Sequence, residues 1–450
     1  MDKEEKKINR RDYLKYTGAA IGGLVVGGAL GYLLKPSEVI KETVTAPGAT
    51  ATTTVEKIAT KTITATVEKT VTSIVTPTTP TLGPPIKIGY CGPLSGAGAD
   101  LGQQSLQGAI LAIEEANAAG GVLGRKLELY KGDNKGVPAE AVTATRKLII
   151  DNEVVAIVGQ VYSSCTLAAM PLYAEYKVVG VVDTSTSPKI TQGAGVGGND
   201  WIFRINLPDD INGWAYGKIV VEKGGKRICM LAVNDDWGKG VVDGFSKTFI
   251  KEGATILSVD YYLEGETDFR TVLTKIKDLK PDCLFMCART AMGATIIKQA
   301  YEIGLHPAVP IFVQGDVIND EFLRLVGPKI AEGIMACESW FPGSPESKDF
   351  EDAYKKRWGV TAWEPGAYGY IATKAILKAI EASKDATSDG IRRGLKMLDW
   401  PTFVGRVKFD EHNQGWTKVV VAKWGPEGKV IPVYEVEVER PPGYWEGTWG

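Results

Sequence analysis

Short apolar runs of β type alternate with segments of helical period along most of the chain. Within the first helical segment, Leu106, Ile110 and Ile113 recur at helical spacing, and Gly120 and Gly121 end the pattern as a left-handed cap does. This alternation predicts an α/β architecture with largely parallel sheets, whose folded part begins near Ile86. The runs that we expect to form strands are 86–90, 127–130, 154–159, 178–182, 201–204, 227–233, 256–262, 283–288, 311–314 and 333–337.

The N-terminal residues have a different pattern. Several basic residues precede position 16, and residues 16–34 carry no charge. The run Arg10-Arg-Asp-Tyr-Leu-Lys15 resembles the twin-arginine export motif. Because a spanning helix needs roughly 17 to 25 residues, the uncharged run is long enough to cross a bilayer. We therefore expect residues 1–35 to be a signal or an uncleaved anchor that places the rest outside the cell membrane, with secretion as the alternative if it is cleaved.

Residues 36–85 are dominated by Thr, Val, Glu and Lys, and the sequence Thr-Val-Glu-Lys occurs at 54–57 and again at 66–69. The segment lacks the large apolar side chains whose burial offsets the entropy lost on ordering a chain. We expect an extended or disordered stalk with threonines open to O-glycosylation, holding the folded part away from the membrane.

Composition narrows the classes of partner. The chain has 450 residues, which exceeds what one core usually supports, and its net charge of −2 offers no basic surface for nucleic acid. With only two histidines and six cysteines without C-x-x-C spacing, we expect no metal site, no cofactor and buried thiols. Cys283 and Cys287 would share one face of a strand but stand too far apart to form a disulfide.

Three runs at the start of the folded region carry a resemblance to a known family. Ile86-Lys-Ile-Gly-Tyr90, Gly92-Pro-Leu-Ser-Gly96 and the segment 108–125 closely resemble the opening of the leucine/isoleucine/valine-binding protein family. Further matches continue to about residue 438. The resemblance implies a type I periplasmic-binding fold, in which two discontinuous lobes are joined by three crossover strands. Each lobe is a largely parallel sheet flanked by helices, and a ligand binds in the cleft between them.

The resemblance also divides the chain. Residues 86–204 with 342–410 would form the N-terminal lobe, residues 205–341 with 411–438 the C-terminal lobe, and residues 439–450 a tail. The crossings would fall near 204–207, 339–342 and 410–416.

Two polar loops of the N-terminal lobe are candidates to hold a ligand carboxylate. Ser163 and Ser164 follow an expected strand and precede a helix, where backbone N–H groups are unpaired, although a serine there also serves as an ordinary cap. The family's carboxylate-binding serine matches Ser163. The loop with Thr184, Ser185 and Thr186 matches a family segment that contacts both ends of an amino acid, although Pro188 would also close an ordinary polar turn.

Aromatic and acidic residues are the candidates elsewhere. Trp237 matches a family aromatic that covers the cleft, and Tyr370 matches another near its rim, although both also suit ordinary packing and Tyr368 could replace Tyr370. Asp316 lies where the family keeps the acid that pairs with the ligand's amine.

Two positions depart from the family pattern. Leu101 stands where well-known members have an aromatic residue, and Arg289 falls close to a further family tyrosine. An arginine in the cleft would favour a second ligand carboxylate, as in acidic amino acids or organic acids. The alternative for Arg289 is a solvated residue at the start of a helix.

The run Gly193-Ala-Gly-Val-Gly-Gly198 spells the dinucleotide fingerprint, but it precedes an expected strand instead of linking a strand to a helix. Since no nucleophile motif or acid–base pair stands out, we expect no enzyme. The leading hypothesis is a binding protein that delivers a branched-chain or similar small amino acid to the permease and ATPase subunits of an ABC importer. The alternatives are a sensor or receptor domain for amides, urea or organic and aromatic acids, and a structural surface protein.

Overall fold

The computed structural model describes residues 83–447. The predicted signal or anchor and nearly all of the predicted stalk lie outside the described residues. Within residues 83–447, no helix has both the length and the apolar character to cross a membrane.

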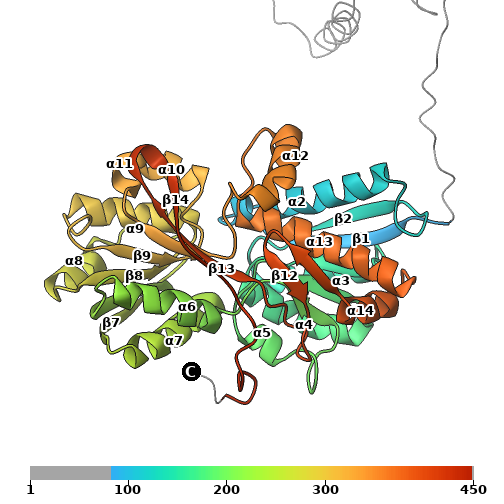
Figure 1. Ribbon diagram of the computed structural model, residues 1–450, viewed down its shortest axis with the longest axis horizontal. Coiled ribbons are helices and arrows are strands. Elements are labelled where there is room, and N and C mark those ends of the chain that lie inside the picture. Colours follow the sequence, from blue (N-terminus) through green and yellow to red (C-terminus); the bar gives the residue numbers. More distant parts are fainter. Residues whose placement is uncertain (1–82, 448–450) are drawn as a thin grey trace, which may run out of the picture. The chain divides into compact units, whose positions relative to one another are not determined.

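The N-terminal lobe is built on a parallel sheet whose strand order is β2-β1-β3-β4-β5 (Figure 1). Its inner strands β3 and β4 are short, apolar and buried, as expected for parallel strands that are covered on both faces, whereas the edge strand β2 carries charged residues. The strands are β1 (Ile86–Gly92), β2 (Leu127–Asp133), β3 (Ala156–Gly159), β4 (Val179–Val182) and β5 (Ile202–Arg204).

Alternate side chains of this sheet enter two separate cores. Ile88 and Tyr90 of β1 face one core, whereas the next residue, Cys91, faces the other. Helices α2 (Ala99–Ala118), α12 (Lys348–Trp358), α13 (Glu364–Ser383) and α14 (Ser388–Lys396) contribute to the first core. Helices α3 (Pro138–Ile150), α4 (Ser163–Tyr176) and α5 (Lys189–Gln192) contribute to the second core.

The C-terminal lobe contains a larger sheet with the order β14-β13-β10-β9-β8-β6-β7. The adjacent strands β7, β6, β8, β9 and β10 are parallel to one another, whereas β13 is antiparallel to β10 and to β14. The strands are β6 (Arg227–Val233), β7 (Thr255–Tyr262), β8 (Cys283–Cys287), β9 (Ile311–Gln314), β10 (Met335–Glu338), β13 (Lys418–Trp424) and β14 (Val430–Glu437).

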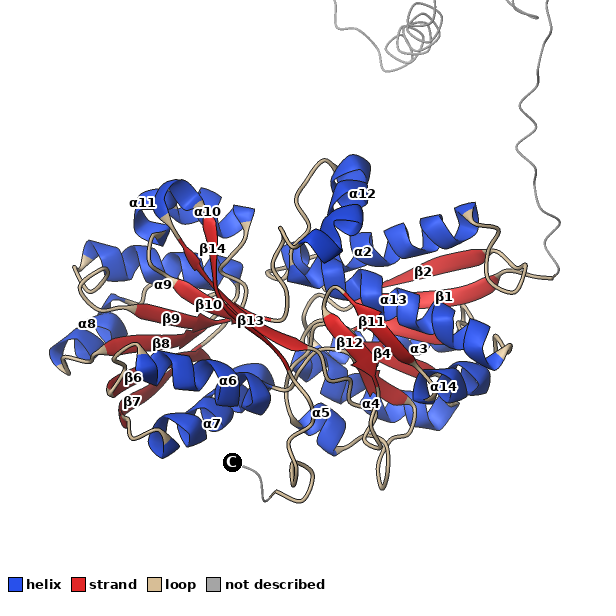
Figure 2. Cartoon of the chain, in the orientation of Figure 1, coloured by secondary structure: helices blue, strands red, loops and turns tan. Residues whose placement is uncertain are grey.

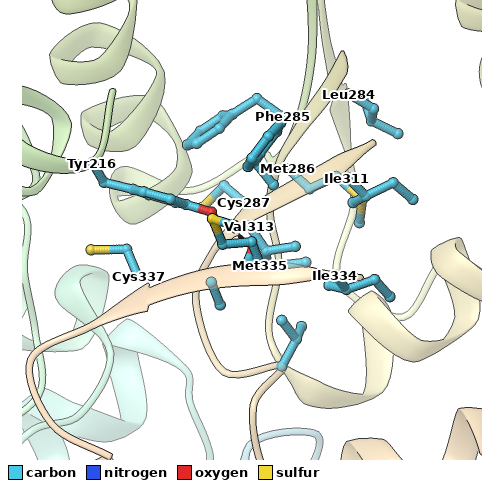
Figure 3. Packing of buried hydrophobic residues seen from close by; sticks show 14 of the residues in the cluster. Tyr216, Leu284, Phe285, Met286, Cys287, Ile311, Val313, Ile334, Met335 and Cys337 are labelled. Atoms are coloured by element: carbon cyan, nitrogen blue, oxygen red, sulfur yellow. Dashed lines mark hydrogen bonds between the residues drawn. The ribbon is translucent and has the colours of Figure 1, made fainter. Parts of the chain in front are cut away.

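Helices flank this second sheet on both sides (Figure 2). In its core, the ring of Tyr216 packs near Phe285, and the Tyr216 hydroxyl donates a hydrogen bond of 2.8 Å to the carbonyl of Met335 (Figure 3). The helices are α6 (Asp209–Glu222), α7 (Asp236–Lys251), α8 (Arg270–Asp278), α9 (Thr290–Glu302), α10 (Asp320–Val326) and α11 (Pro328–Ala331).

The chain passes between the lobes after β5, after β10 and before β13, so that each lobe is discontinuous in sequence. A small hairpin of β11 (Asp399–Thr402) and β12 (Gly405–Lys408) precedes the third passage. Two short 3-10 turns, Pro345–Ser347 and Pro426–Gly428, complete the described elements. This arrangement confirms the predicted fold class of two discontinuous α/β lobes.

The run that spells a dinucleotide fingerprint is a surface turn after α5. Its Val196 N–H donates to the carbonyl of Glu411, so the turn is fixed by the third passage between the lobes. All six cysteines are buried and free, as predicted.

Candidate functional site

A cavity lies at the carboxyl ends of strands from both sheets, which is where open α/β folds bind ligands. It encloses about 40 Å³. Its lining from the N-terminal lobe includes Leu101, Tyr162, Ser163, Thr184, Ser185, Thr186 and Glu364. Its lining from the C-terminal lobe includes Asn212, Trp237, Arg289, Gln314, Asp316 and Glu338.

Ser163 is the first residue of α4 and lines this cavity. No side chain caps the start of the helix, so its N-terminal N–H groups and their partial positive charge remain available to an anion. The Ser163 hydroxyl accepts a hydrogen bond of 3.2 Å from the N–H of Ser187, which fixes its position. Ser164 is not among the lining residues of the cavity.

The loop after β4 brings three hydroxyl groups to the same wall, but they differ in their partners. The Ser185 hydroxyl donates to the carbonyl of Val161 at 3.0 Å and lies 2.7 Å from the hydroxyl of Thr166, so it holds two loops together. The Thr184 hydroxyl is buried and has no hydrogen-bond partner. Thr184 therefore has a free group to offer a ligand, and Ser185 mainly positions the loop.

Arg289 lies between two aromatic rings and joins the lobes. Its guanidinium carbon is 3.9 Å from the ring centre of Tyr162 and 4.7 Å from that of Trp237, in cation–π contact with both. Its nitrogens form ion pairs of 2.7 Å with Asp235 and 2.8 Å with Glu264. Because two carboxylates already pair with this single positive charge, a ligand anion would have to displace one of them.

Three carboxyl groups also meet at this cavity. Oxygens of Asp316, Glu338 and Glu364 lie within 4.8 Å of one another, close enough to share one cation. Burial raises the pKa of Asp316 to about 8, and the negative charges of Glu364 and Asp100 add to this effect. Burial and the adjacent Glu364 also raise the pKa of Glu338 well above its usual range. Both shifts have the direction expected for burial and nearby like charges, and the charge of Arg289, which lowers the pKa of Asp316, does not reverse its shift.

Hydrogen bonds connect this acidic cluster to the segments that pass between the lobes. Glu364 accepts from the side-chain amide of Asn206 and from the N–H of Ser339, both at 3.2 Å. The amide of Gln414 donates to the carbonyl of Asn206 and its oxygen accepts from the buried Arg204. One residue from each passage thus belongs to a network that ends at the cavity.

The remaining two predicted site residues lie in different places. Leu101 is buried and lines the cavity from α2. Tyr370 is outside this lining, since its ring packs on Phe350 and its hydroxyl donates to Glu115 at 2.7 Å. The alternative residue, Tyr368, is buried next to Thr417 and does not line the cavity either.

Comparison with known proteins agrees with the fold. The family model described as "Periplasmic binding protein" matches residues 85–429. The chain belongs to the periplasmic binding protein family. The predicted resemblance to leucine/isoleucine/valine-binding proteins is confirmed by relatives with that name, such as the Leu/Ile/Val-binding protein of Escherichia coli, which is 26% identical over 72% of this chain and 87% of its own length.

Two further comparisons show similarity of this periplasmic binding protein to proteins named for amino acid binding. It is 28% identical to an amino acid binding protein of Pseudomonas aeruginosa, over 76% of this chain and 91% of the relative. The solved structure of the branched-chain amino acid transporter substrate binding protein LivJ from Streptococcus pneumoniae, in complex with isoleucine, has a TM-score of 0.71 and 26% identity, over 79% of this chain and 100% of that one.

Several lining residues of this periplasmic binding protein were absent from the sequence-based candidates: Tyr162, Asn212, Gln314, Glu338 and Glu364. Gln314 ends the expected strand 311–314 and Glu338 directly follows the expected strand 333–337, so their position at a carboxyl end was a usable signal. Glu364 begins α13 far along the chain, and only the folded structure brings it to Asp316.

Proposed function

We propose that this protein is the extracytoplasmic solute-binding subunit of an ABC importer, which captures a small amino-acid-like ligand between its lobes and delivers it to a permease. The observation that carries the proposal is the pairing of opposite chemistries across one cavity. Hydroxyl groups and a helix N-terminus in its lining suit a carboxylate, and the cluster of carboxyl groups in the same lining suits an amine.

Closure of the lobes over a ligand would create the form that a permease recognises. Two contacts between the lobes support a closing motion. One is the stacking of Arg289 on Tyr162, and the other is an exposed ion pair of 3.2 Å between Lys189 and Asp236. In this proposal the N-terminal segment keeps the protein at the outer face of the membrane, within reach of the permease and its ATPase.

The test is thermal unfolding of the full-length chain with a panel of amino acids, amides and organic acids. A ligand at a hundredfold excess over its dissociation constant stabilises the folded state by about 2.7 kcal/mol. Substitution Ser163→Ala should weaken an amino acid ligand by about tenfold, since one hydrogen bond to a charged group is lost. The neighbouring Ser164→Ala variant is the matched control and should bind normally. If no compound in the panel stabilises the protein, the proposed function is wrong.

A further inference from the structure

The charge of the acidic cluster is not balanced inside the protein. Among residues 83–447, no lysine or arginine lies within 4.0 Å of the carboxylates of Asp316, Glu338 and Glu364. Arg289, the cationic side chain in the lining of this cavity, already forms ion pairs with Asp235 and Glu264. Ionised carboxylates are costly to keep together in a buried place without a counterion.

Two amide side chains add further unmet acceptors to the same cavity. The side-chain oxygens of Gln314 and Asn212 are buried and have no hydrogen-bond donor. Gln314 is 4% exposed and Asn212 is 2% exposed, and both line the cavity with the acidic cluster. An unpaired buried acceptor costs free energy, so this lining favours a ligand that brings several N–H donors.

A second cavity continues from the acidic cluster. It has a volume of about 360 Å³ and shares Leu101 and the three clustered acids with the first cavity. Its own acids are Asp100, Asp320 and Glu321, against the single basic residue Arg324, which is paired with Glu321. The aromatic side chains of Trp340, Phe341 and Trp363 also line it. The space next to the cluster is therefore acidic and partly aromatic, which suits an extended organic cation.

Building on the proposed function, we propose that the ligand is a compact organic cation with a second amino or guanidino group, such as a basic amino acid or a short diamine. Its positive end lies among Asp316, Glu338 and Glu364. A carboxylate, when the ligand has one, lies at Ser163 and the start of α4.

A bare divalent cation explains less of the lining. It would occupy the acidic cluster alone and would leave the acids and aromatic rings of the second cavity without a role. Glu364 already accepts two N–H groups from Asn206 and Ser339, which orients its carboxylate for further N–H donors. An organic cation uses the cluster, the unpaired amide oxygens and the aromatic surface together.

The first experiment measures thermal unfolding of the full-length chain with lysine, ornithine, arginine, putrescine and cadaverine at equal ionic strength. Leucine, isoleucine, valine, glutamate, Mg²⁺ and Ca²⁺ form the comparison set. A larger shift with the amines than with the comparison set supports the inference. The Ser163→Ala substitution distinguishes basic amino acids from diamines. It should weaken the binding of amino acids, which have a carboxylate, and leave the binding of diamines unaffected.

Other outcomes overturn the inference in different ways. Stabilisation by leucine, isoleucine or valine without a response to the amines would contradict the cationic ligand but leave the proposed binding function intact. Stabilisation by divalent ions alone would assign the cluster to a metal. No response to any compound would contradict both the inference and the proposed function.

The substitution Glu338→Gln separates a binding role from a structural one, because its two effects have opposite signs. It should raise the unfolding temperature of the free protein, since one of three crowded carboxyl groups is removed. It should also weaken the stabilising amine by about 30-fold or more, since a buried charge loses its partner. The exposed substitution Glu332→Gln is the control and should change neither quantity. Loss of stability without loss of amine affinity would show a merely structural Glu338.

Discussion

Two charged clusters lie at the same cavity but differ in whether residues of opposite charge are paired within them. Around Arg289, one cation forms ion pairs with two carboxylates, Asp235 and Glu264, and is covered by two aromatic rings. Around Asp316, three carboxyl groups have no cation within ion-pairing distance among the described residues, and the pKa of Asp316 rises to about 8. The first cluster is complete within the protein, whereas the second is completed by a ligand.

This difference separates two roles that residue type alone does not distinguish. An arginine in a cleft suggests an anion-binding residue, but a buried guanidinium with two carboxylate partners acts as a structural element that also joins the lobes. Clustered acids without a paired cation carry an energetic cost in the free protein, and a cationic ligand can relieve that cost. The set of charged partners around a residue is therefore a better guide to its function than its residue type alone.

The largest expected effect on stability comes from removing Arg289, the central cation of the first cluster. The Arg289→Met variant leaves Asp235 and Glu264 facing each other and removes the stacking on Tyr162 and Trp237. Breaking a buried ion pair usually costs 3–5 kcal/mol, but these acids are 21% and 30% exposed, so we expect a loss of about 2 kcal/mol. Denaturant unfolding measures the loss.

The control for Arg289 is an exposed arginine with the same number of acidic partners. Arg270 pairs with Asp268 and Glu302, and its side chain is 51% exposed. The Arg270→Met variant should therefore lose much less stability than the Arg289→Met variant. Equal losses in the two variants would contradict the structural role of the Arg289 cluster.

The acidic cluster around Asp316 should make the stability of the folded state depend on pH. The pKa of Asp316 is raised to about 8 in the folded state, against about 3.9 in an unfolded chain. Between these values the folded state binds more protons than the unfolded state, so this group makes stability fall as pH rises from about 4 to 8. The Asp316→Asn variant does not titrate there and should gain about 1–2 kcal/mol over the wild type by pH 8, less than the full shift implies, because Asp316 is only partly buried and solvent screens its charge.

Unfolding free energies of both proteins at several pH values between 4 and 8 measure this gain. The surface substitution Asp268→Asn is a suitable control, because hydrogen bonding to the N–H of Arg270 lowers the pKa of Asp268 and its effect must have the opposite sign. A constant difference between wild type and Asp316→Asn at all pH values would contradict the raised pKa.

Most of the fold could be predicted because its signals are local. The expected strands near residues 86, 227, 283 and 311 agree with β1, β6, β8 and β9 within a few residues. The strands β13 and β14 were not among those expected, although Lys418–Trp424 is largely apolar. Their pairing is antiparallel and outside the strand–helix alternation, so the pattern that revealed the other strands did not apply to them.

The site was predictable only in part. Ser163, the loop at Thr184 and Asp316 follow strands, and the structure brings all three to one cavity. The partners of Arg289 could not be inferred, because Asp235 and Glu264 lie far from it in sequence and only tertiary packing brings them together. The same holds for Glu364, which joins Asp316 from the other lobe.

The smallest expected effect concerns Tyr370, which lies outside the cavity lining. Its hydroxyl donates to Glu115, and Glu115 keeps an ion pair of 2.8 Å with Lys374 when that hydroxyl is removed. The Tyr370→Phe variant should therefore lose about 1 kcal/mol of stability or less and retain its full ligand affinity. Titration of the variant with the stabilising ligand provides the measurement. A loss of affinity would place Tyr370 in the binding site after all, and would mean that the ligand extends beyond the two acidic cavities.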